Sequence, residues 1–426
     1  MNVEKAILII AASALLVATV LMTVNVLVNQ LDNRKLSLEQ RVQTILDNQP
    51  IIDGHNDLPW NIRNLAYNDL RRINLASDLS KHEIWGKVNT SYTDFPRLRK
   101  GRVGALFWGA YTDCSSQLKD SVEQTLEQID LIKRLVKKYP NYLEFAFSAA
   151  DIENAIENKK IASLIGIEGG HSIQFSFGIL RMFYSMGARY MTLTHDCNTP
   201  WVDASPVDPS SVDKNPTLLP QNDGISEFGL RIVKEMNRLG MMIDISHVSQ
   251  RAMEKALKHS VAPVIFSHSS ARAICDHHRN VPDSVLRLVK KTNSIVMVTF
   301  SSAVVRCDGT RGNVSDVVKH IQHIRSITGP EHIGLGGAYD GGDVFPKGLE
   351  DCSKYPNLFK ALLKTGDWTV EDLEKLAGKN ILRVFQAVEQ KRNELKDQEM
   401  EQGFINGEEL DKKKVNLTCI TANFER

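Results

Sequence analysis

The sequence has no excess of charge of either sign. Its 52 Lys and Arg residues nearly balance 51 Asp and Glu residues, which leaves a formal net charge of +1. No basic stripe, acidic tail, internal repeat or low-complexity tract is present. Because nucleic-acid-binding proteins usually carry a basic patch, we expect no nucleic-acid partner.

Cysteine is scarce, and its spacing excludes one class of metal site. The chain has six cysteines and no CxxC pair, so structural zinc held by thiolates is not expected. The C-terminus, NLTCITANFER, has no hydrophobic tail of the kind that a glycolipid anchor replaces. The 42% of hydrophobic residues can nevertheless form one large core, since α/β barrels often reach this length.

A long hydrophobic run lies near the N-terminus, at residues 6–28. It carries no charge, and it exceeds the about 20 residues that a helix needs to cross a bilayer. We therefore predict that residues 1–35 form an uncleaved membrane anchor, with a cleaved signal peptide and secretion as the alternative. The body, residues 36–395, would then be extracellular or lumenal, and residues 396–426 would form an exposed tail.

Glycosylation sequons agree with this location, although each is weak alone because such triplets often arise by chance. The asparagines of the three sequons are Asn89, Asn313 and Asn416. In such a compartment the cysteines are expected to form disulfide bonds. We therefore predict a glycoprotein with disulfides.

Apolar stretches alternate with helical ones along the body. Eight of these stretches are strand candidates, at residues 51–57, 104–110, 161–167, 190–194, 241–247, 264–268, 294–300 and 332–337. A short extra strand is expected at residues 143–147, and one helix at residues 370–390. The alternation predicts a TIM-type (β/α)8 barrel, with its chemistry where the strands end. A doubly wound sheet would instead gather its site at one switch point.

A histidine ends each of two successive strand candidates, His247 the first and His268 the second. Imidazoles on neighbouring strand ends can bind one metal ion. Two ordinary hydrogen-bonded histidines are the alternative.

The first and third strands carry further side chains of metal-binding type. His55 and Asp57 are two residues apart, so both lie on the same side of a strand. Glu168 ends an apolar strand, where a carboxylate is costly unless it is paired or binds metal. A simple His–Asp pair, and an ion pair between Glu168 and a basic side chain, remain alternatives.

Together these five side chains suit two divalent cations that share Glu168. Imidazole and carboxylate donors favour zinc, though manganese or cobalt also fits. Two such ions activate water and polarise a carbonyl, which is the chemistry of hydrolysis. The predicted cofactor is therefore Zn²⁺, two per chain, held by His55, Asp57, Glu168, His247 and His268.

Two further residues follow the strands at the same rim. His195 is a candidate ligand or a donor to a developing oxyanion, with a plain rim histidine as the alternative. Arg279 has the guanidinium geometry to clamp a substrate carboxylate, but its spacing alone favours a surface arginine.

Seven segments resemble the membrane (renal-type) dipeptidases of the zinc dipeptidase family. They are IIDGHNDLPW (51–60), ASLIGIEGGHSI (162–173), RYMTLTHDCNTPW (189–201), NRLGMMIDISHVS (237–249), APVIFSHSSARAI (262–274), RNVPD (279–283) and SKYPNL (353–358). The resemblance covers about residues 49–390. The combination is specific, although no single motif is.

The resemblance implies a dinuclear zinc exopeptidase that hydrolyses dipeptides on a barrel. It assigns the same five ligands, with Glu168 as the shared, catalytic bridge. His195 would contact the scissile carbonyl. Arg279 and Asp340 would bind the substrate, Arg279 through the C-terminal carboxylate.

The resemblance also assigns the cysteines. It implies one disulfide between Cys114 and Cys197 and a second between Cys275 and Cys307. Cys419 matches a cysteine that links two subunits, which implies a disulfide-linked homodimer. Cys352 has no counterpart and is expected to be free.

Two departures from the family pattern bear on function. The family usually has a C-terminal glycolipid anchor, whereas the anchor candidate here is residues 6–28. The family's eighth strand ends Gly-x-Asp-Phe-Asp-Gly, and Ala338 replaces the first Asp, the one assigned to proton transfer. General acid–base groups contribute about 10²–10⁴-fold to the catalytic rate. The alternative function is therefore a catalytically impaired, dipeptidase-like binding protein, unless Asp340 shifts to compensate.

Another dinuclear amidohydrolase is disfavoured, because that group more often uses His-x-His and a carbamylated lysine.

Overall fold

A closed barrel of parallel strands forms the centre of the computed structural model, which describes residues 36–212, 216–342 and 344–419. Nine strands pair in the order β2-β1-β9-β8-β7-β6-β5-β4-β3, and β2 also pairs with β4 to close an eight-stranded ring. The strands are β1 (Ile51–Asn56), β2 (Val103–Tyr111), β3 (Leu143–Phe145), β4 (Ile161–Glu168), β5 (Ala188–Thr192), β6 (Met242–Asp244), β7 (Ile265–Ser269), β8 (Ile295–Val298) and β9 (Ile333–Leu335). The predicted TIM-type barrel is confirmed.

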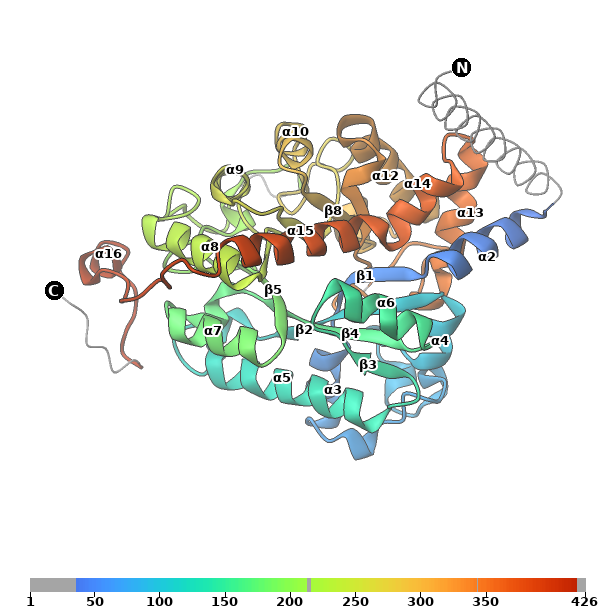
Figure 1. Cartoon of the computed structure of the whole chain (residues 1–426), viewed down its shortest axis with the longest axis horizontal. Coiled ribbons are helices and arrows are strands. Elements are labelled where there is room, and N and C mark those ends of the chain that lie inside the picture. Colours follow the sequence, from blue (N-terminus) through green and yellow to red (C-terminus); the bar gives the residue numbers. More distant parts are fainter. Residues whose placement is uncertain (1–35, 213–215, 343, 420–426) are drawn as a thin grey trace, which may run out of the picture.

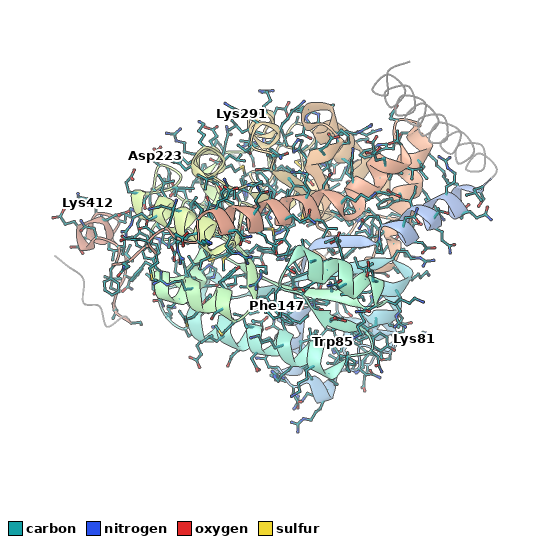
Figure 2. All side chains as sticks on the ribbon, viewed as in Figure 1. Lys81, Trp85, Phe147, Asp223, Lys291 and Lys412 are labelled. Atoms are coloured by element: carbon teal, nitrogen blue, oxygen red, sulfur yellow. A yellow bond between two sulfur atoms is a disulfide. The ribbon has the colours of Figure 1, made fainter. Side chains whose placement is uncertain are left out.

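Helices surround the barrel, and α15 crosses the face seen in Figure 1. The α-helices are α2 (Leu38–Asn48), α3 (Leu58–Ala66), α4 (Phe95–Lys100), α5 (Ser121–Lys138), α6 (Ala149–Glu157), α7 (Phe177–Ser185), α8 (Glu227–Leu239), α9 (Gln250–His259), α10 (Asp283–Lys291), α11 (Ser302–Val305), α12 (Val314–Thr328), α13 (Tyr355–Thr365), α14 (Val370–Glu374), α15 (Asn380–Glu394) and α16 (Gly407–Lys412). Charged side chains such as Lys291 and Lys412 project outward (Figure 2).

The strands are buried on both faces, which explains why their sequences are continuously apolar. In β2, Phe107 belongs to a core cluster with side chains from several other strands and from α6 and α15, whereas Leu106 and Trp108 belong to the larger cluster with side chains of most other helices. In β4, Leu164 and Ile165 divide in the same way. Alternate residues therefore fill the barrel interior and the layer between strands and helices.

Two local expectations differ from the structure or are refined by it. The extra strand β3 pairs with the first half of β4, while β5 pairs with its second half. The single helix expected at residues 370–390 is instead α14, a π-helical turn (Lys375–Lys379) and α15. At Gly378 in that turn, an added Cβ would lie 2.5 Å from Gln49 Nε2 and 2.9 Å from Ile52, so the turn packs its backbone directly against the barrel.

The predicted N-terminal anchor lies outside the described residues. Within the described ranges, no helix has both the length and the apolar character needed to cross a membrane.

The C-terminal tail is less exposed than expected. Ile405 and Leu410 are buried, and the Glu401 carboxylate binds Arg231 and Lys234 of α8 at 2.9 and 2.7 Å. The burial of Ile405 and Leu410 is hard to predict from the sequence, because both lie singly in a segment rich in Lys and Glu.

The disulfides implied by the resemblance are present. Cys114 joins Cys197 and Cys275 joins Cys307, while Cys352 is free and buried and Cys419 is free and exposed. The three sequon asparagines are exposed.

A tight interior contact yields a stability prediction. At Gly166 of β4, an added Cβ would lie 2.0 Å from the ring of the buried Tyr190 on β5. We expect Gly166→Ala to lower the free energy of unfolding by about 1–3 kcal/mol, as overpacked cores do. Gly178→Ala, at an exposed helical position with its nearest contact at 3.5 Å, is the control that keeps wild-type stability in urea unfolding. Equal unfolding midpoints for both variants would contradict the prediction.

Candidate metal centre

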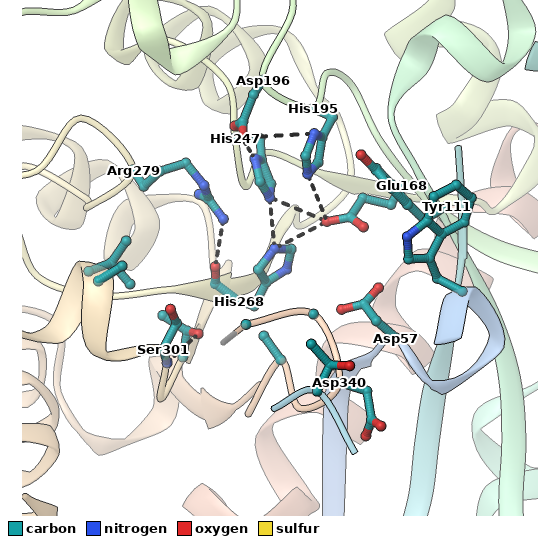
Figure 3. A pocket seen from close by; sticks show the side chains of 18 of the residues that line it. Asp57, Tyr111, Glu168, His195, Asp196, His247, His268, Arg279, Ser301 and Asp340 are labelled. Carbon is teal, nitrogen blue, oxygen red and sulfur yellow. Dashed lines mark hydrogen bonds and ion pairs between the residues drawn. The ribbon is translucent and has the colours of Figure 1, made fainter. Parts of the chain in front are cut away.

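Five candidate ligands converge at the C-terminal rim of the barrel. Figure 3 shows four of them, Asp57, Glu168, His247 and His268. Glu168 is the last residue of β4, His55 lies in β1, His268 lies in β7, and Asp57 directly follows β1. His247 was expected at a strand end, but β6 ends three residues earlier, at Asp244. His247 instead occupies a turn with φ 64°. From this turn its ring faces Glu168 and His268.

Glu168 lies between the histidines. One carboxylate oxygen, Oε2, is 3.4 Å from Nε2 of His55. The other, Oε1, is 3.3 Å from Nε2 of His247 and 3.4 Å from Nε2 of His268. Asp57 Oδ1 lies 3.1 Å from His55 Nε2. The two oxygens of Glu168 therefore face two groups of donors, as a ligand shared by two ions would.

Hydrogen bonds on the outer side of the rings fix the proton of His55. Its Nδ1 lies 2.8 Å from the Tyr190 hydroxyl, which itself donates to the Gly54 carbonyl at 3.1 Å. Because the single hydroxyl proton of Tyr190 is donated to the Gly54 carbonyl, the hydroxyl oxygen accepts a hydrogen bond from His55 Nδ1–H. The lone pair of Nε2 is then directed to the centre.

The other two histidines follow the same rule. His268 Nδ1 lies 2.8 Å from the Ser267 hydroxyl, which donates to the Asp244 carboxylate at 2.6 Å. His247 Nδ1 donates to Asp196 Oδ1 at 2.8 Å, since a carboxylate can only accept. In its neutral form, each ring therefore presents Nε2 as an acceptor.

Two of these acceptors face each other. The Nε2 atoms of His247 and His268 are 2.9 Å apart, and neither carries a proton in the tautomer that its Nδ1 contact selects. A cation between them resolves this repulsion, and imidazole nitrogens bind zinc at about 2.0–2.1 Å. The residues present thus fit a dinuclear metal centre.

The ionisable side chains of the centre shift one another's pKa values. Burial opposes ionisation of Glu168, but His55 and the other imidazoles outweigh it and hold the pKa of Glu168 well below its usual range. Burial, together with nearby His55, keeps the pKa of His268 well below normal. Burial opposes protonation of His55, but Asp57, Tyr190 and Glu168 outweigh burial and hold the pKa of His55 well above its usual range. A metal ion that binds His55 Nε2 would therefore displace a proton, as metal binding to histidine generally does.

His195 lies beside the ligands rather than among the closest atoms. Its Nε2 is 4.0 Å from Glu168 Oε1, and its ring centroid is 4.2 Å from that of His247. Burial and the nearby His247 lower the pKa of His195 to about 4. Near pH 7 it is a neutral imidazole with one N–H to donate.

Arg279 is not the surface residue that its spacing favoured. It is 8% exposed, and it lines a cavity of about 740 Å³ together with Glu168, His195, His247 and His268. Its Nη2 donates to the His268 carbonyl at 3.4 Å, while Nη1 is buried without a partner. A buried guanidinium with an unused N–H is suited to an anionic ligand.

The residues after β9 do not supply a carboxylate to the centre. Ala338 lines the cavity with φ 54°. Asp340 also lines the cavity, but its carboxylate accepts from Thr93, from Asn61 Nδ2 at 3.2 Å and from the Tyr92 amide at 3.3 Å. These bonds turn it away from Glu168 (Figure 3), so the structure shows no compensating shift.

Sequence reasoning missed the residues that orient the rings, because their contacts join strands far apart in the chain. The signal that could have identified them is their position, because Tyr190, Asp244 and Ser267 place polar groups on otherwise apolar, buried strands. A further group of possible donors, Cys114, His171 and Cys197, holds no free thiolate, because its two cysteines form a disulfide.

Removing the acceptor behind His55 tests this arrangement. We expect Tyr190→Phe to weaken zinc binding about 10–100-fold, the usual loss when the partner of a ligating histidine is removed. Zinc per chain is measured after equilibration in zinc–chelator buffers. Tyr184→Phe, which removes a hydroxyl whose partner is Arg392, is the matched control and should retain wild-type zinc binding. Equal affinities for the two variants would refute the proposed orienting role.

Known proteins share this sequence and fold. A sequence profile described as "Membrane dipeptidase (Peptidase family M19)" matches residues 39–399. Dipeptidase 3 of Mus musculus is 45% identical over 355 residues, which cover 83% of this chain and 68% of that protein. Dipeptidase 3 of Homo sapiens is 44% identical over 365 residues, covering 86% and 70%.

Two solved structures share the fold. A metallopeptidase from Rhodobacter sphaeroides, liganded with a phosphinate mimic of the dipeptide L-Ala-D-Ala, is 21% identical with a TM-score of 0.68 and covers 80% of this chain and 99% of its own. Dipeptidase AC, a family M19 metallopeptidase, is 22% identical with a TM-score of 0.68, covering 80% and 98%. At these identities the structures support the fold, while the profile and the curated relatives extend over most of the chain. The chain therefore belongs to the membrane dipeptidase family, peptidase family M19.

Proposed function

We propose that this chain is a zinc-dependent membrane dipeptidase with two zinc ions per chain. The observation that carries the proposal is the convergence of three histidine Nε2 atoms and two carboxylates. All of these residues except His55 line the cavity that Arg279 also lines. His55 and Asp57 would hold one ion, and His247 and His268 the other. Glu168 would be the shared ligand.

Each other residue has a role that its environment supports. Bound zinc would activate a water and polarise the scissile carbonyl. Neutral His195 would donate its N–H to the carbonyl oxygen as negative charge develops there. Arg279 would hold the C-terminal carboxylate through its unpartnered Nη1, which favours short peptides with a free C-terminus. Asp340 would position substrate only indirectly, through the cavity wall.

The location and assembly of the chain are proposals of the same kind. Residues 1–35 would anchor the protein, with the body extracellular or lumenal and secretion after signal cleavage as the alternative. The exposed sequon asparagines and the two disulfides support an oxidising compartment. The free, exposed Cys419 is available to link two subunits.

A second candidate function is a catalytically impaired relative that binds peptides without efficient turnover. Ala338 favours it, because a methyl group in the cavity wall cannot transfer a proton. The metal ligands do not depend on this residue, so binding and turnover are separable.

Restoring a carboxylate at this position distinguishes the two candidates. We expect Ala338→Asp to raise kcat on a panel of dipeptides by about 10²–10⁴-fold, the usual contribution of an acid–base group. Zinc content should not change. Ala338→Asn is the matched control, since it suits the same backbone conformation but supplies no base.

The wild-type rate then decides between them. Dipeptide hydrolysis above the zinc-stripped background supports the dipeptidase, and none, with recovery in Ala338→Asp, supports the impaired relative. Two bound zincs with no hydrolysis by either form would reject both the enzyme and the role of this position.

The role of Arg279 is measurable by binding alone. We expect zinc-loaded protein to bind Ala-Ala about tenfold or more tightly than its C-terminal amide, because the amide lacks the charged partner. Arg279→Gln should abolish this difference in calorimetry, whereas Arg287→Gln, at an exposed position on α10, should retain it. Equal binding of acid and amide by the wild type would exclude the carboxylate clamp.

A further inference from the structure

A second group of possible metal ligands lies outside the candidate metal centre. In this group, a ring nitrogen of His171 and the sulfur atoms of Cys114 and Cys197 lie within 4.8 Å of one another. Cys114 follows β2, His171 follows β4 and Cys197 follows β5, and β4 pairs with both of the other strands. The two cysteines form a disulfide in the structure, so reduction of one bond would release two thiols beside the ring.

The His171 ring has a nitrogen that no hydrogen bond uses. Its Nε2 lies 3.0 Å from the Thr112 carbonyl, which can only accept, so Nε2 carries the proton. Nδ1 therefore keeps its lone pair, and it is buried without a hydrogen-bond partner in the part of the chain that the structure describes. The side chain is 0% exposed, and burial lowers the pKa of His171. The ring is thus a neutral imidazole with an unused lone pair, the form that binds a metal.

The segments that carry the three side chains are held together independently of the disulfide. The Ser121 hydroxyl donates to the His171 carbonyl at 2.9 Å, and Gln117 Nε2 donates to the Asn198 carbonyl at 3.0 Å. Beside the ring, Gly169 has φ 107°, and an added Cβ would lie 2.5 Å from Nδ1, so the glycine keeps that side of the ring uncovered. We therefore expect the three side chains to stay close after the disulfide breaks.

The two sulfurs are accessible from solvent. Cys114 and Cys197 are partly exposed, and both line a cavity of about 420 Å³ whose described lining includes none of the five candidate ligands of the metal centre. Zinc binds sulfur at about 2.3 Å and imidazole nitrogen at about 2.0–2.1 Å, so these atoms lie roughly 3.6 Å apart around a tetrahedral ion. A movement of about 1 Å brings the group to this geometry.

We propose that Cys114, Cys197 and His171 form a zinc site when the disulfide between the two cysteines is reduced. A dithiol supplies the two electrons and two protons: its own sulfurs join in a disulfide, the Cys114–Cys197 bond breaks, and each cysteine becomes a thiol. A zinc ion then bonds to both sulfurs and to the lone pair of the His171 ring, and the two thiol protons pass to solvent. Water completes the tetrahedron.

This ion would take the place of the covalent link between the loops that follow β2 and β5. Cys197 lies two residues after His195, and His171 lies three residues after Glu168. The ion would therefore hold the backbone next to two residues of the candidate metal centre in the reduced protein. The inference does not depend on the proposed function, because its ligands are different side chains.

Cobalt binding to the full chain tests the site, because Co²⁺ absorbs strongly in the near ultraviolet when thiolates bind it and not when nitrogen and oxygen alone do. A phosphine reduces the protein and becomes its oxide with the oxygen of one water; it is removed before Co²⁺ is added. We expect the reduced wild type to bind one more cobalt per chain than the oxidised protein and to show the thiolate band.

Paired variants locate the band. Cys114→Ser with Cys197→Ser should abolish the band and the additional cobalt after the same reduction. Cys275→Ser with Cys307→Ser, which removes the other disulfide, is the matched control and should retain both. His171→Gln keeps an N–H for the Thr112 carbonyl but should bind this cobalt about tenfold or more weakly, because one of three protein ligands is lost. Thermal melts verify that each variant is folded.

Each outcome supports or overturns the site. No thiolate band in the reduced wild type overturns it, whether or not the reduced chain stays folded. A band that survives Cys114→Ser with Cys197→Ser assigns the metal to other cysteines and overturns it as well. Equal cobalt affinity of the wild type and His171→Gln overturns the role of His171. An increase in the melting temperature of the reduced wild type on addition of Zn²⁺, absent from Cys114→Ser with Cys197→Ser, supports the site with the proposed ion.

Discussion

A buried carboxylate among imidazoles is the constraint on which the site depends. Glu168 is 4% exposed, and an unpaired charge in such a position costs several kcal/mol. Three histidines from other strands and turns approach its two oxygens within 3.4 Å. This compensation needs the ends of β1, β4 and β7 and the turn after β6 to meet at one rim, which the closed parallel barrel provides.

The sequence predicted the barrel and the convergence of the ligands because both follow from local patterns. A continuously apolar segment that ends in His, Asp or Glu indicates a parallel strand and also marks its functional end. β4 is the clearest case, since all of its residues are buried and the last is Glu168. Parallel strands in a closed ring then bring such ends together without any further information.

The remaining features depend on contacts that no local pattern contains. The burial of Arg279 results from the packing of two loops, and its spacing favoured the surface. Tyr190 orients His55 across the barrel interior, 135 residues away along the chain. The orientation of Asp340 is set by Thr93 and Asn61, in segments that precede it by more than two hundred residues. Such partners become visible only when the barrel closes.

Under the proposed function, metal binding and proton transfer would be carried by different parts of this site, so Ala338 can be considered separately from the candidate ligands. Ala338 contacts the ligand shell through its backbone, whose N–H donates to the His55 carbonyl at 3.2 Å, so the side chain can change without moving a ligand. Its left-handed conformation, with φ 54°, costs an alanine about 1 kcal/mol and suits Asp or Asn better. Alanine therefore gives this turn no stability advantage over the aspartate of the family pattern.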